Sequence, residues 1–519
     1  MLSTTTDPNG QTVTYKSYDP LLRPTEIDYP DGGKLIASYS PNSVGWNQYM
    51  TASTHTNIET GQESYGRLLW VAVQNAPGSY YFNNYCYDGN GNLQYAAYRF
   101  AAPNQNNDSC SGAGDSYTYD TLGRVLQTTH ADSSTVIYAY NGRATKVTDE
   151  NGVSRIVQVD GLGRTTAVCE ISGSTLLGVA PVNCGLDISG TGFLTQYAYN
   201  TDYSRSNAQE ITVTQGAQTR YFETDFLGRT TLVVQPESGV TTYSYAYSGS
   251  AGYGLTVTRV RPEENQPVGS TNTVTTTTQY DSVGRVVSVN YSDGFTPSKG
   301  FSYDTNAYWA QTGTNLKGRL AVTGTGGTAT WTGSLFSYDA MGRVVNIWQC
   351  APATCGTGNQ AARPLSFAYD WAGNLIQESD GVSGTIAYGR STAGEVTSIT
   401  NETYHDLPYD PPNLVSNLVN GPDGPVSYTL GNGLNVYRSY DQLGRYVQQW
   451  VCNGPAAVNC SGGTAIYGTA SRWNGSQMQT QSDTVLNQGI TFGYGDGFNR
   501  LTSRTVTSGT LQNYTYAYD

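Results

Sequence analysis

The six residues Tyr119-Asp120-Thr121-Leu122-Gly123-Arg124 form a motif that recurs along the chain. Five further copies, two of which lack the tyrosine, begin at Val159, Thr224, Tyr280, Tyr338 and Tyr440. The aspartate, glycine and arginine of the six copies are Asp120, Gly123 and Arg124; Asp160, Gly163 and Arg164; Asp225, Gly228 and Arg229; Asp281, Gly284 and Arg285; Asp339, Gly342 and Arg343; and Asp441, Gly444 and Arg445. Looser relatives begin at Tyr18, Tyr87, Tyr369 and Tyr494, so the pattern covers essentially the whole chain of 519 residues. Repetition on this scale predicts an architecture that reuses one short structural unit.

The chemistry of the motif favours a tight turn between two β-strands. Its aspartate can accept hydrogen bonds from backbone N–H groups two residues further on, as in an Asx turn. Its glycine can adopt the left-handed conformation, and the aliphatic residue before the glycine is expected to plug the core. Its arginine can pair with a carboxylate or lie across a tyrosine ring. We interpret these motif residues as structural, because a catalytic aspartate is needed once and a turn aspartate in every repeat.

The segments on either side of the motif are predicted to be strands. Tyrosines alternate with other residues before it, as in residues 138–140, 197–199 and 243–247, which places the tyrosines on one face of a strand. β-branched residues follow it, as in residues 285–289, and a turn that contains glycine comes next. The order strand, turn, strand, turn therefore describes most of the chain.

The spacing of the motif distinguishes between repeat architectures. Neighbouring motif aspartates lie 31 residues apart between Asp339 and Asp370 but 71 residues apart between Asp370 and Asp441. A β-propeller requires a nearly constant blade length. The variable spacing instead predicts an all-β fold, in which one long antiparallel sheet of hairpins winds continuously over residues 1–519 without separate globular domains.

Composition restricts the class of partner. Charged residues make up 13% of the chain, while 42 tyrosines and 60 glycines far exceed average usage. The 27 basic and 40 acidic residues give a net charge of −13 and include no basic cluster, so we expect no nucleic-acid partner. No apolar run approaches the roughly 18 residues of a membrane span, so we expect no membrane-spanning segment. Residues 1–4 lack the basic and apolar regions of a signal peptide.

The eight cysteines form four pairs that are close in sequence, namely Cys86 with Cys110, Cys169 with Cys184, Cys350 with Cys355, and Cys452 with Cys460. Each pair flanks a stretch whose composition predicts a loop between neighbouring strands. We expect four disulfides, because closing a loop of about 15 residues contributes roughly 3 kcal/mol and such bonds persist in oxidising compartments. Zinc is an alternative, but the chain has only three histidines and no C-x2-C spacing. Free thiols are the remaining alternative.

Each candidate catalytic or metal-binding site in the sequence has a simpler, structural interpretation. His55, His130 and His405 stand alone, without a serine-elbow or zinc-helix motif. The adjacent acids at 149–150 resemble a glycosidase pair, but neighbouring acids point different ways and usually face water. Residues 88–92 resemble part of a calcium loop but lack its terminal glutamate. We therefore expect no catalytic residue, no cofactor and no metal.

The repeated Tyr-Asp-x-x-Gly-Arg motif, joined by Tyr-x-Tyr strands, resembles the YD repeats of bacterial Rhs proteins, Tc-toxin C components, wall-associated bacterial proteins and animal teneurins. The resemblance implies a β-sheet that spirals into a hollow shell or cocoon. In the bacterial toxins the shell encloses a C-terminal toxic domain, and in teneurins it is part of an adhesion ectodomain. Because the chain ends at Tyr518-Asp519, inside another copy of the motif, we carry over the shell but not the family's C-terminal core, autoproteolytic aspartates or toxin. We expect both ends to be cut from a longer chain.

These observations favour a secreted or bacterial cell-surface scaffold, without catalytic activity, that encloses or presents a polypeptide such as a toxin domain. A cell-surface adhesin that binds a glycan or a protein is one alternative. An extracellular fibre that self-associates through the edges of its sheet is another. Tyrosine faces suit an inner wall that holds unfolded polypeptide or an outer face that binds sugars, although cross-strand packing is the simpler account for most of them.

Overall fold

The computed structural model describes residues 1–103, 110–176, 178–202, 208–247, 254–263, 271–305, 311–326, 332–350, 363–381, 384–401 and 412–518. These residues contain 42 β-strands and the 3₁₀ turn η2 (Val458–Cys460). Within these ranges, no helix has both the length and the apolar character that a membrane crossing requires.

The strands follow one another on two successive circuits of a coil. The first circuit contains β1 (Thr4–Thr6), β2 (Thr12–Tyr18), β3 (Pro24–Asp28), β4 (Lys34–Tyr39), β5 (Ser43–Tyr49), β6 (His55–Gln62), β7 (Leu68–Ala76), β8 (Ser79–Tyr87), β9 (Leu93–Ala97), β10 (Phe100–Ala102), β11 (Gly114–Tyr119), β12 (Val125–Thr129), β13 (Thr135–Asn141), β14 (Ala144–Thr148), β15 (Ser154–Val159), β16 (Thr165–Ile171), β17 (Val182–Asn183), β18 (Thr191–Asp202), β19 (Ala208–Gln215), β20 (Gln218–Thr224), β21 (Thr230–Gln235), β22 (Gly239–Tyr247), β23 (Leu255–Pro262), β24 (Thr273–Tyr280) and β25 (Val286–Tyr291). The second contains β26 (Lys299–Tyr303), β27 (Leu320–Thr325), β28 (Thr332–Tyr338), β29 (Val344–Cys350), β30 (Arg363–Tyr369), β31 (Leu375–Ser379), β32 (Thr385–Arg390), β33 (Val396–Asn401), β34 (Asn413–Gly421), β35 (Gly424–Leu430), β36 (Asn435–Tyr440), β37 (Tyr446–Asn453), β38 (Thr464–Asn474), β39 (Gln477–Asp483), β40 (Gln488–Tyr494), β41 (Leu501–Ser508) and β42 (Tyr514–Thr515).

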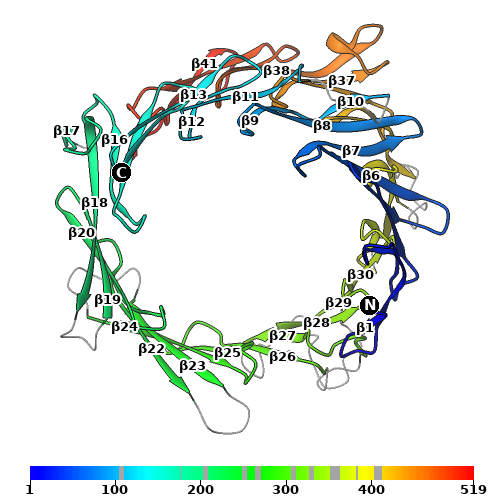
Figure 1. The fold of residues 1–519 in the computed structure, drawn as a ribbon, viewed down its shortest axis with the longest axis horizontal. Helices are drawn as coiled ribbons and strands as arrows, with labels where there is room; N and C mark the ends of the chain where they lie inside the picture. The colour runs from blue at the N-terminus through cyan, green and yellow to red at the C-terminus, as the bar shows by residue number, and fades with distance from the viewer. Residues whose placement is uncertain are drawn as a thin grey trace.

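The strands form one continuous antiparallel sheet, because almost every strand pairs with its neighbours in sequence. The short strands β10 and β17 pair only with β8 and β18, so the main sheet continues from β9 to β11 and from β16 to β18. Figure 1 shows that the sheet closes into a ring, and no strand crosses the middle of the ring. The predicted all-β sheet of hairpins is therefore confirmed.

Alternation of strand direction gives the coil two edges with different turns. The turns at 120–124 and 160–164 are separated by the four strands β12 to β15, so both lie at the same edge. We call this edge the motif rim. The turns between them, such as the one at 130–134, lie at the other edge, which we call the opposite rim.

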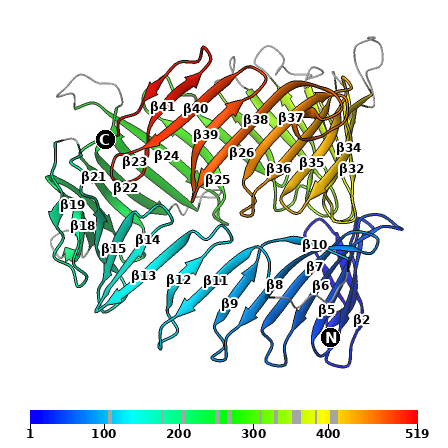
Figure 2. The same ribbon diagram turned by 90° about the horizontal axis from the view of Figure 1, so that it is seen from above.

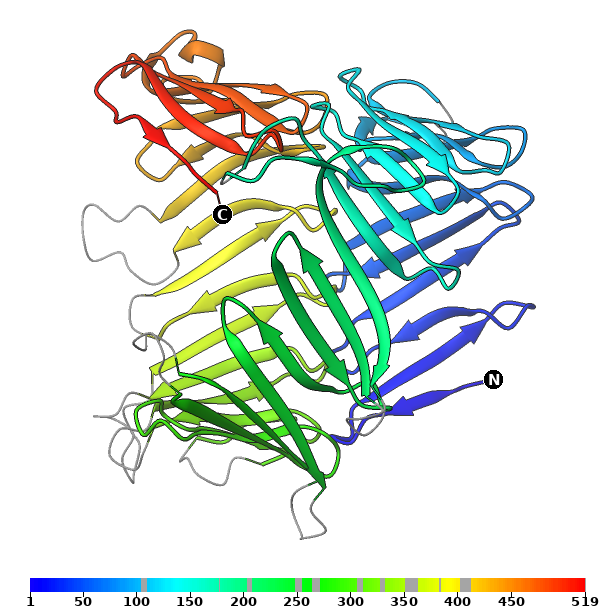
Figure 3. The same ribbon diagram turned by 90° about the vertical axis from the view of Figure 1, so that its left-hand side faces the viewer.

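The second circuit runs beside the first, so that the motif rim of the second circuit meets the opposite rim of the first. The yellow to red strands of the second circuit continue the wall beside the blue to cyan strands of the first, above them in Figure 2 and to their left in Figure 3. Three ion pairs across this boundary join residues that are 312 or 313 positions apart in sequence. We call this boundary the seam.

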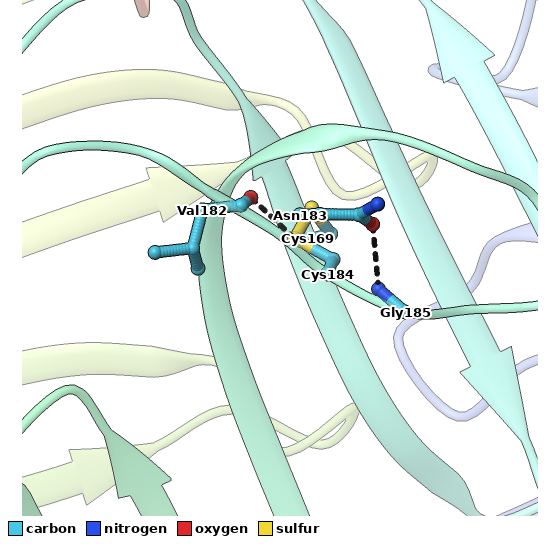
Figure 4. Close-up of a disulfide and its surroundings, with 5 residues drawn as sticks. All are labelled: Cys169, Val182, Asn183, Cys184 and Gly185. Carbon is cyan, nitrogen blue, oxygen red and sulfur yellow. Dashed lines mark hydrogen bonds between the residues drawn. A yellow bond between two sulfur atoms is a disulfide. The ribbon is translucent and has the colours of Figure 1, made fainter.

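The core is distributed along the wall in small clusters. In one of them, Ala144, Ile156, Cys169 and Cys184 are buried, and aliphatic side chains of the segment after β16 pack against them. The disulfide between Cys169 and Cys184, whose Cα atoms lie 6.1 Å apart, fastens this segment to the sheet (Figure 4). The N–H of Gly185 donates to Asn183 Oδ1 at 3.0 Å beside the bridge.

Three of the four expected disulfides lie entirely within the described residues. They join Cys86 to Cys110, Cys169 to Cys184, and Cys452 to Cys460. Cys350 is also disulfide-bonded, but Cys355, its expected partner, lies outside the described residues.

Candidate functional site in the motif turns and the seam

Each motif turn is organised around the carboxylate of its aspartate. In the turn after β11, Asp120 Oδ1 accepts hydrogen bonds from the N–H groups of Leu122 and Arg124, both at 2.9 Å. Asp120 Oδ2 accepts from Arg124 Nε at 2.7 Å. Gly123 has a φ of +76°, the left-handed conformation that suits glycine. Both carboxylate oxygens are therefore used inside the turn.

The other five copies have the same geometry. In each, the arginine Nε lies 2.6 or 2.7 Å from the second carboxylate oxygen of the motif aspartate. The glycines all have positive φ values, from +72° at Gly444 to +87° at Gly284. The turn is therefore one unit repeated around the coil, as its recurrence in the sequence predicts.

The expectation that the aliphatic residue of the motif plugs the core is wrong. Leu122 is 75% exposed and Leu162 is 80% exposed. The Asx turn directs this residue away from the sheet, because Oδ1 of the aspartate holds its N–H and the chain has already left the strand. These side chains therefore lie on the rim, outside the sheet.

The motif arginine also connects its turn to the next hairpin. The guanidinium of Arg124 lies 4.3 Å from the ring centroid of Tyr140 in β13. The hydroxyl of Tyr140 donates to the carbonyl of Val125, the residue that follows the arginine, at 2.8 Å. A cation–π contact of this kind contributes about 0.5 to 2 kcal/mol. The tyrosine is thereby clamped at both its ring and its hydroxyl.

This clamp repeats along the motif rim. The same pair of contacts joins Arg164 to Tyr199, Arg229 to Tyr245, Arg285 to Tyr303 and Arg500 to Tyr518. After Arg445, the indole of Trp473 replaces the tyrosine and donates to the carbonyl of Tyr446 at 3.1 Å. The Tyr-x-Tyr strands therefore supply the aromatic partner of the preceding motif, a role that sequence reasoning did not assign to them.

Hydrogen bonds within the turn lower the pKa of four motif aspartates, Asp120, Asp160, Asp225 and Asp281. The backbone N–H of Arg124 is the largest cause of the lowered pKa of Asp120, partial burial opposes it, and the Arg124 side chain adds to it. The pKa of Asp160 is lowered in the same way by Arg164. At Asp225 the side chain of Arg229 is the largest cause. These carboxylates are therefore held in the charged form.

In the seam, motif-rim arginines of the second circuit bind aspartates on the opposite rim of the first. Arg343 Nη2 lies 2.9 Å from Asp31 Oδ2, and both side chains are largely buried. Arg445 binds Asp132 at 3.2 Å in the same way. Arg319, which follows a looser turn, binds Asp7 at 3.3 Å. Arg343 and Arg445 thus hold two carboxylates each, one in their own turn and one across the seam.

Apolar and backbone contacts close the seam between these ion pairs. The N–H of Trp371 donates to the carbonyl of Met50 across the seam at 3.0 Å. Trp371 also lies against Gly33, where an added Cβ would be only 2.9 Å from the Trp371 Cβ. Any larger residue at this position would push the two circuits apart. Further along, the rings of Phe193 and Phe498 meet edge to face.

The remaining sequence-based candidates take structural positions. His130 Nδ1 lies 2.8 Å from Asp115 Oδ1, to which the hydroxyl of Tyr98 also donates. Burial, followed by the bond to Asp115, raises the pKa of Tyr98 above its usual value. His55 packs on the ring of Tyr49, and His405 lies outside the described residues.

The calcium-like stretch is a motif-type turn. Asp88 Oδ1 accepts from the N–H groups of Asn90 and Asn92, and Oδ2 accepts from Asn92 Nδ2. Within the described ranges, no group of three or more His, Cys, Asp or Glu side chains could hold a metal ion.

Sequence reasoning missed the seam aspartates Asp7, Asp31 and Asp132. Each begins or lies in a short polar turn, which is a visible signal. Their partners lie 312 or 313 residues away, and no local pattern indicates such a separation.

Comparison with known proteins supports the identification of the repeated motif as an Rhs-type repeat. The family model described as RHS Repeat matches residues 1–34. No curated protein matches the chain. The N-terminal match covers β1 to β3 and the first looser copy of the motif.

Solved structures show a similar fold. A chain in the structure of a Photorhabdus luminescens Tc holotoxin pore, with a mutation in TccC3, aligns with 97% of this chain at a TM-score of 0.62 and 12% identity. A chain of a TcdB2–TccC3 complex without its hypervariable C-terminal region aligns with 97% of this chain at 13% identity, with a TM-score of only 0.34. The alignments cover 31% and 35% of those chains, so this chain spans about a third of their length.

Replacing Gly284 by valine tests the left-handed turn. Gly284 has a φ of +87° and open space around its Cβ position, so the whole cost is backbone strain of about 1 to 3 kcal/mol. Gly161→Val is the matched control, because Gly161 lies in the same kind of turn with open space but without a positive φ. We expect urea unfolding to show a loss of stability for Gly284→Val alone. Equal effects in the two variants would show that the φ value is not the cause.

Acid should destabilise the fold through the motif aspartates. The pKa values of Asp120, Asp160, Asp225 and Asp281 are lower in the folded chain than in the unfolded chain, so their contribution is complete above about pH 4 and is lost as the pH falls through the folded values. We expect the Tm, followed by circular dichroism, to decrease below about pH 4. The decrease should be smaller in Asp120→Asn, which has one titrating carboxyl fewer. A Tm that is unchanged by acid in both proteins would contradict this.

Asp31→Asn tests the seam. The asparagine keeps the Asx turn at Gly33 but loses the charge that binds Arg343. We expect the free energy of unfolding to decrease by roughly 1.5 to 3 kcal/mol, as for a hydrogen bond to a charged group. Hydrogen exchange should also become faster at the N–H of Trp371, which bonds across the seam.

Asp293→Asn is the control for this prediction. Asp293 forms an Asx turn at 292–296 on the opposite rim of the coil, and its bonds are local, to Phe295 and Thr296. It should change neither the stability nor the exchange at Trp371. If Asp31→Asn and Asp293→Asn behave alike, the ion pair across the seam does not hold the circuits together.

Proposed function

We propose that this protein, an RHS-repeat chain with a fold like that of a Tc toxin chain, is a non-catalytic β-shell scaffold that encloses or presents a polypeptide. The polypeptide is a partner segment or domain, for example a toxin domain. The protein acts by surrounding this segment and excluding proteases and bulk solvent. The proposal treats residues 1–519 as one continuous repeat array within a longer shell.

The observation that carries this proposal is the closure of the wall in two directions. Strand pairing makes the wall continuous around the ring, and the seam makes it continuous between circuits. A single hairpin array could equally lie flat, where it would enclose nothing. The cost of bringing together residues 312 positions apart is offset at several separate points of the seam. A wall closed in this way is suited to enclosure.

The chemistry of the motif supports a role without catalysis. A general base needs a carboxylate with a free lone pair near its substrate. In the motif aspartates, both carboxylate oxygens instead accept hydrogen bonds from their own turn, as those of Asp120 do from Leu122 and Arg124. The lowered pKa values of Asp120 and Asp160 also make these two carboxylates weak bases. The repeated acid therefore supports a structural assignment.

The disulfides support a location outside the reducing cytosol. The bridges at Cys86, Cys169 and Cys452 each connect residues that are 8 to 24 positions apart. Bonds of this kind persist in oxidising compartments. We therefore propose that the scaffold works at the cell surface or after secretion.

Protection of an attached polypeptide tests the proposal. A flexible Gly/Ser-rich reporter with a protease site is fused after Asp519, and cleavage is compared with that of the free reporter peptide. We expect cleavage of the fused reporter to be at least about tenfold slower, because the wall reduces the population that the protease can reach. Electron micrographs of the same fusion should show ring-shaped or barrel-shaped particles.

Opening the seam provides the matched comparison. The triple variant Asp7→Asn, Asp31→Asn and Asp132→Asn removes three of the ion pairs that join the circuits and leaves the pair of Arg99 with Glu395, and its reporter should be cleaved faster. Asp293→Asn, which lies outside the seam, should leave the protection unchanged. A reporter that is cleaved as fast as the free peptide in the parent chain would overturn the enclosing function.

A further inference from the structure

The two faces of the wall can be assigned to the inside and the outside of the ring. Figure 1 shows β17 outside the ring, and Figure 3, viewed from that side, shows the segment around β17 in front of the sheet. This segment packs against Ile156 and Cys169, so these two side chains point outward. Successive side chains of a strand point to opposite faces. Val157, which follows Ile156 in β15, therefore points into the ring.

Strand pairing extends this assignment along the wall, because residues directly opposite each other in a sheet lie on the same face. Val157 is opposite Val168, and the register continues strand by strand to Val289 in β25, which is opposite Lys299. Lys299 therefore points into the ring. On the same face, six further side chains of β27 to β30 line one groove of about 610 Å³ with Lys299, namely Thr323, Thr325, Thr332, Ser334, Gln349 and Arg363.

Lys299 and Arg363 are the two cations of this groove, on its outermost strands β26 and β30. Both are exposed, and in the described part of the chain neither forms an ion pair. The hairpin loops that connect the strands of the groove, residues 327–331 and 351–362, contain no aspartate or glutamate in their sequence. The groove thus offers two positive charges to a ligand that reaches the inner face.

Other inward-facing cations have counterions within the wall. Arg155, two residues before Val157, binds Glu170 at 3.0 Å. Arg220, which faces inward by the same register, binds Glu237. The chain as a whole carries a net charge of −13, so the uncompensated charge of the groove is a local reversal of sign. We infer a ligand of negative charge from this reversal.

The floor between the two cations is polar. It carries the hydroxyls of threonine and serine side chains and the amide of Gln349, which make no side-chain hydrogen bond within the described ranges. These groups can both donate to and accept from a peptide backbone. Lys299 and Arg363 are four strand spacings apart, roughly 19 Å. An extended peptide rises about 3.3 Å per residue, so acidic residues five or six positions apart match the two cations.

An apolar cavity adjoins the groove on the same face. It has a volume of about 330 Å³, and its apolar side chains are Leu365, Phe367 and Ile386. Leu365 follows Arg363 by two residues in β30, so both lie on the inner face. Glu378 also lines this cavity, but it already accepts a hydrogen bond from the hydroxyl of a tyrosine in β32 at 2.6 Å. The cavity suits an aliphatic or aromatic side chain.

We propose that this groove binds an acidic, extended segment of the enclosed polypeptide. The segment crosses β26 to β30, and its two carboxylates bind Lys299 and Arg363. The hydroxyls between them bind its backbone, and an apolar residue after the second acid enters the cavity at Leu365. The inference rests on the proposed enclosing function and adds to it the charge and the spacing that the inner wall recognises.

Fluorescence polarisation on the purified chain tests the groove. The probe is a fluorescein-labelled Gly/Ser peptide that carries two glutamates five residues apart, followed by a leucine. We expect it to bind at least about tenfold more tightly than the same peptide with glutamines, and to bind more weakly at high salt, because exposed charges are screened. The double variant Lys299→Gln and Arg363→Gln should lose about the same factor. Circular dichroism melting curves establish that each variant is folded.

Arg472→Gln is the matched control. Arg472 is exposed, lies on the outward face by the same register and forms no ion pair in the described part of the chain. Its replacement removes one positive charge from the wall but none from the groove. This variant should bind the glutamate peptide like the parent.

A charge exchange separates direct binding from a structural role of the two cations. The variant Lys299→Glu and Arg363→Glu should prefer a probe with two lysines in place of the glutamates. Equal binding of the glutamate and glutamine probes by the parent, or no reversal in the exchanged variant, would refute the inference. Neither result depends on the enclosing function, which fails instead if the neutral Gly/Ser reporter fused after Asp519 is cleaved as fast as the free peptide.

Discussion

Inside each motif turn, the aspartate binds the arginine four residues later, and this bond sets the geometry of the wall. One oxygen of Asp120 holds the backbone of the turn, and the other holds the Nε of Arg124. With Nε held, the guanidinium is fixed in a plane on which Tyr140 stacks. The turn therefore fixes the position of the next hairpin as well as its own. Repeated around the coil, this coupling keeps a long sheet in order without a large central core.

The same arginine decides whether circuits can be joined. A terminal nitrogen of its guanidinium can bind a second carboxylate. In the seam, Arg343 and Arg445 each bind an aspartate of the first circuit in this way. Gly33 lets the indole of Trp371 approach closely between these ion pairs. A motif that looks like a device for reversing the chain is thus also a device for stacking one layer of wall on another.

The turns, the strands and three disulfides could be predicted because each depends on residues that are close in sequence. Asx turns, left-handed glycines and alternating tyrosines leave local patterns. The aliphatic motif residue was predicted wrongly, because Leu122 looks like a core residue by its type although the turn has already carried it past the edge of the sheet. The arginine stacking was predicted, but its partner, the tyrosine of the following hairpin, could not be chosen among 42 tyrosines.

The hairpin unit, its repetition and the all-β class follow from local sequence, since hydrogen bonds over two to four residues decide them. The curvature of the wall and the pairing of Asp31 with Arg343 are visible only in the folded chain. The physical reason is that the small twist and bend between neighbouring strands add up over many hairpins. Which residues meet after one circuit depends on that sum, and 312 residues of variable strand and loop length contribute to it.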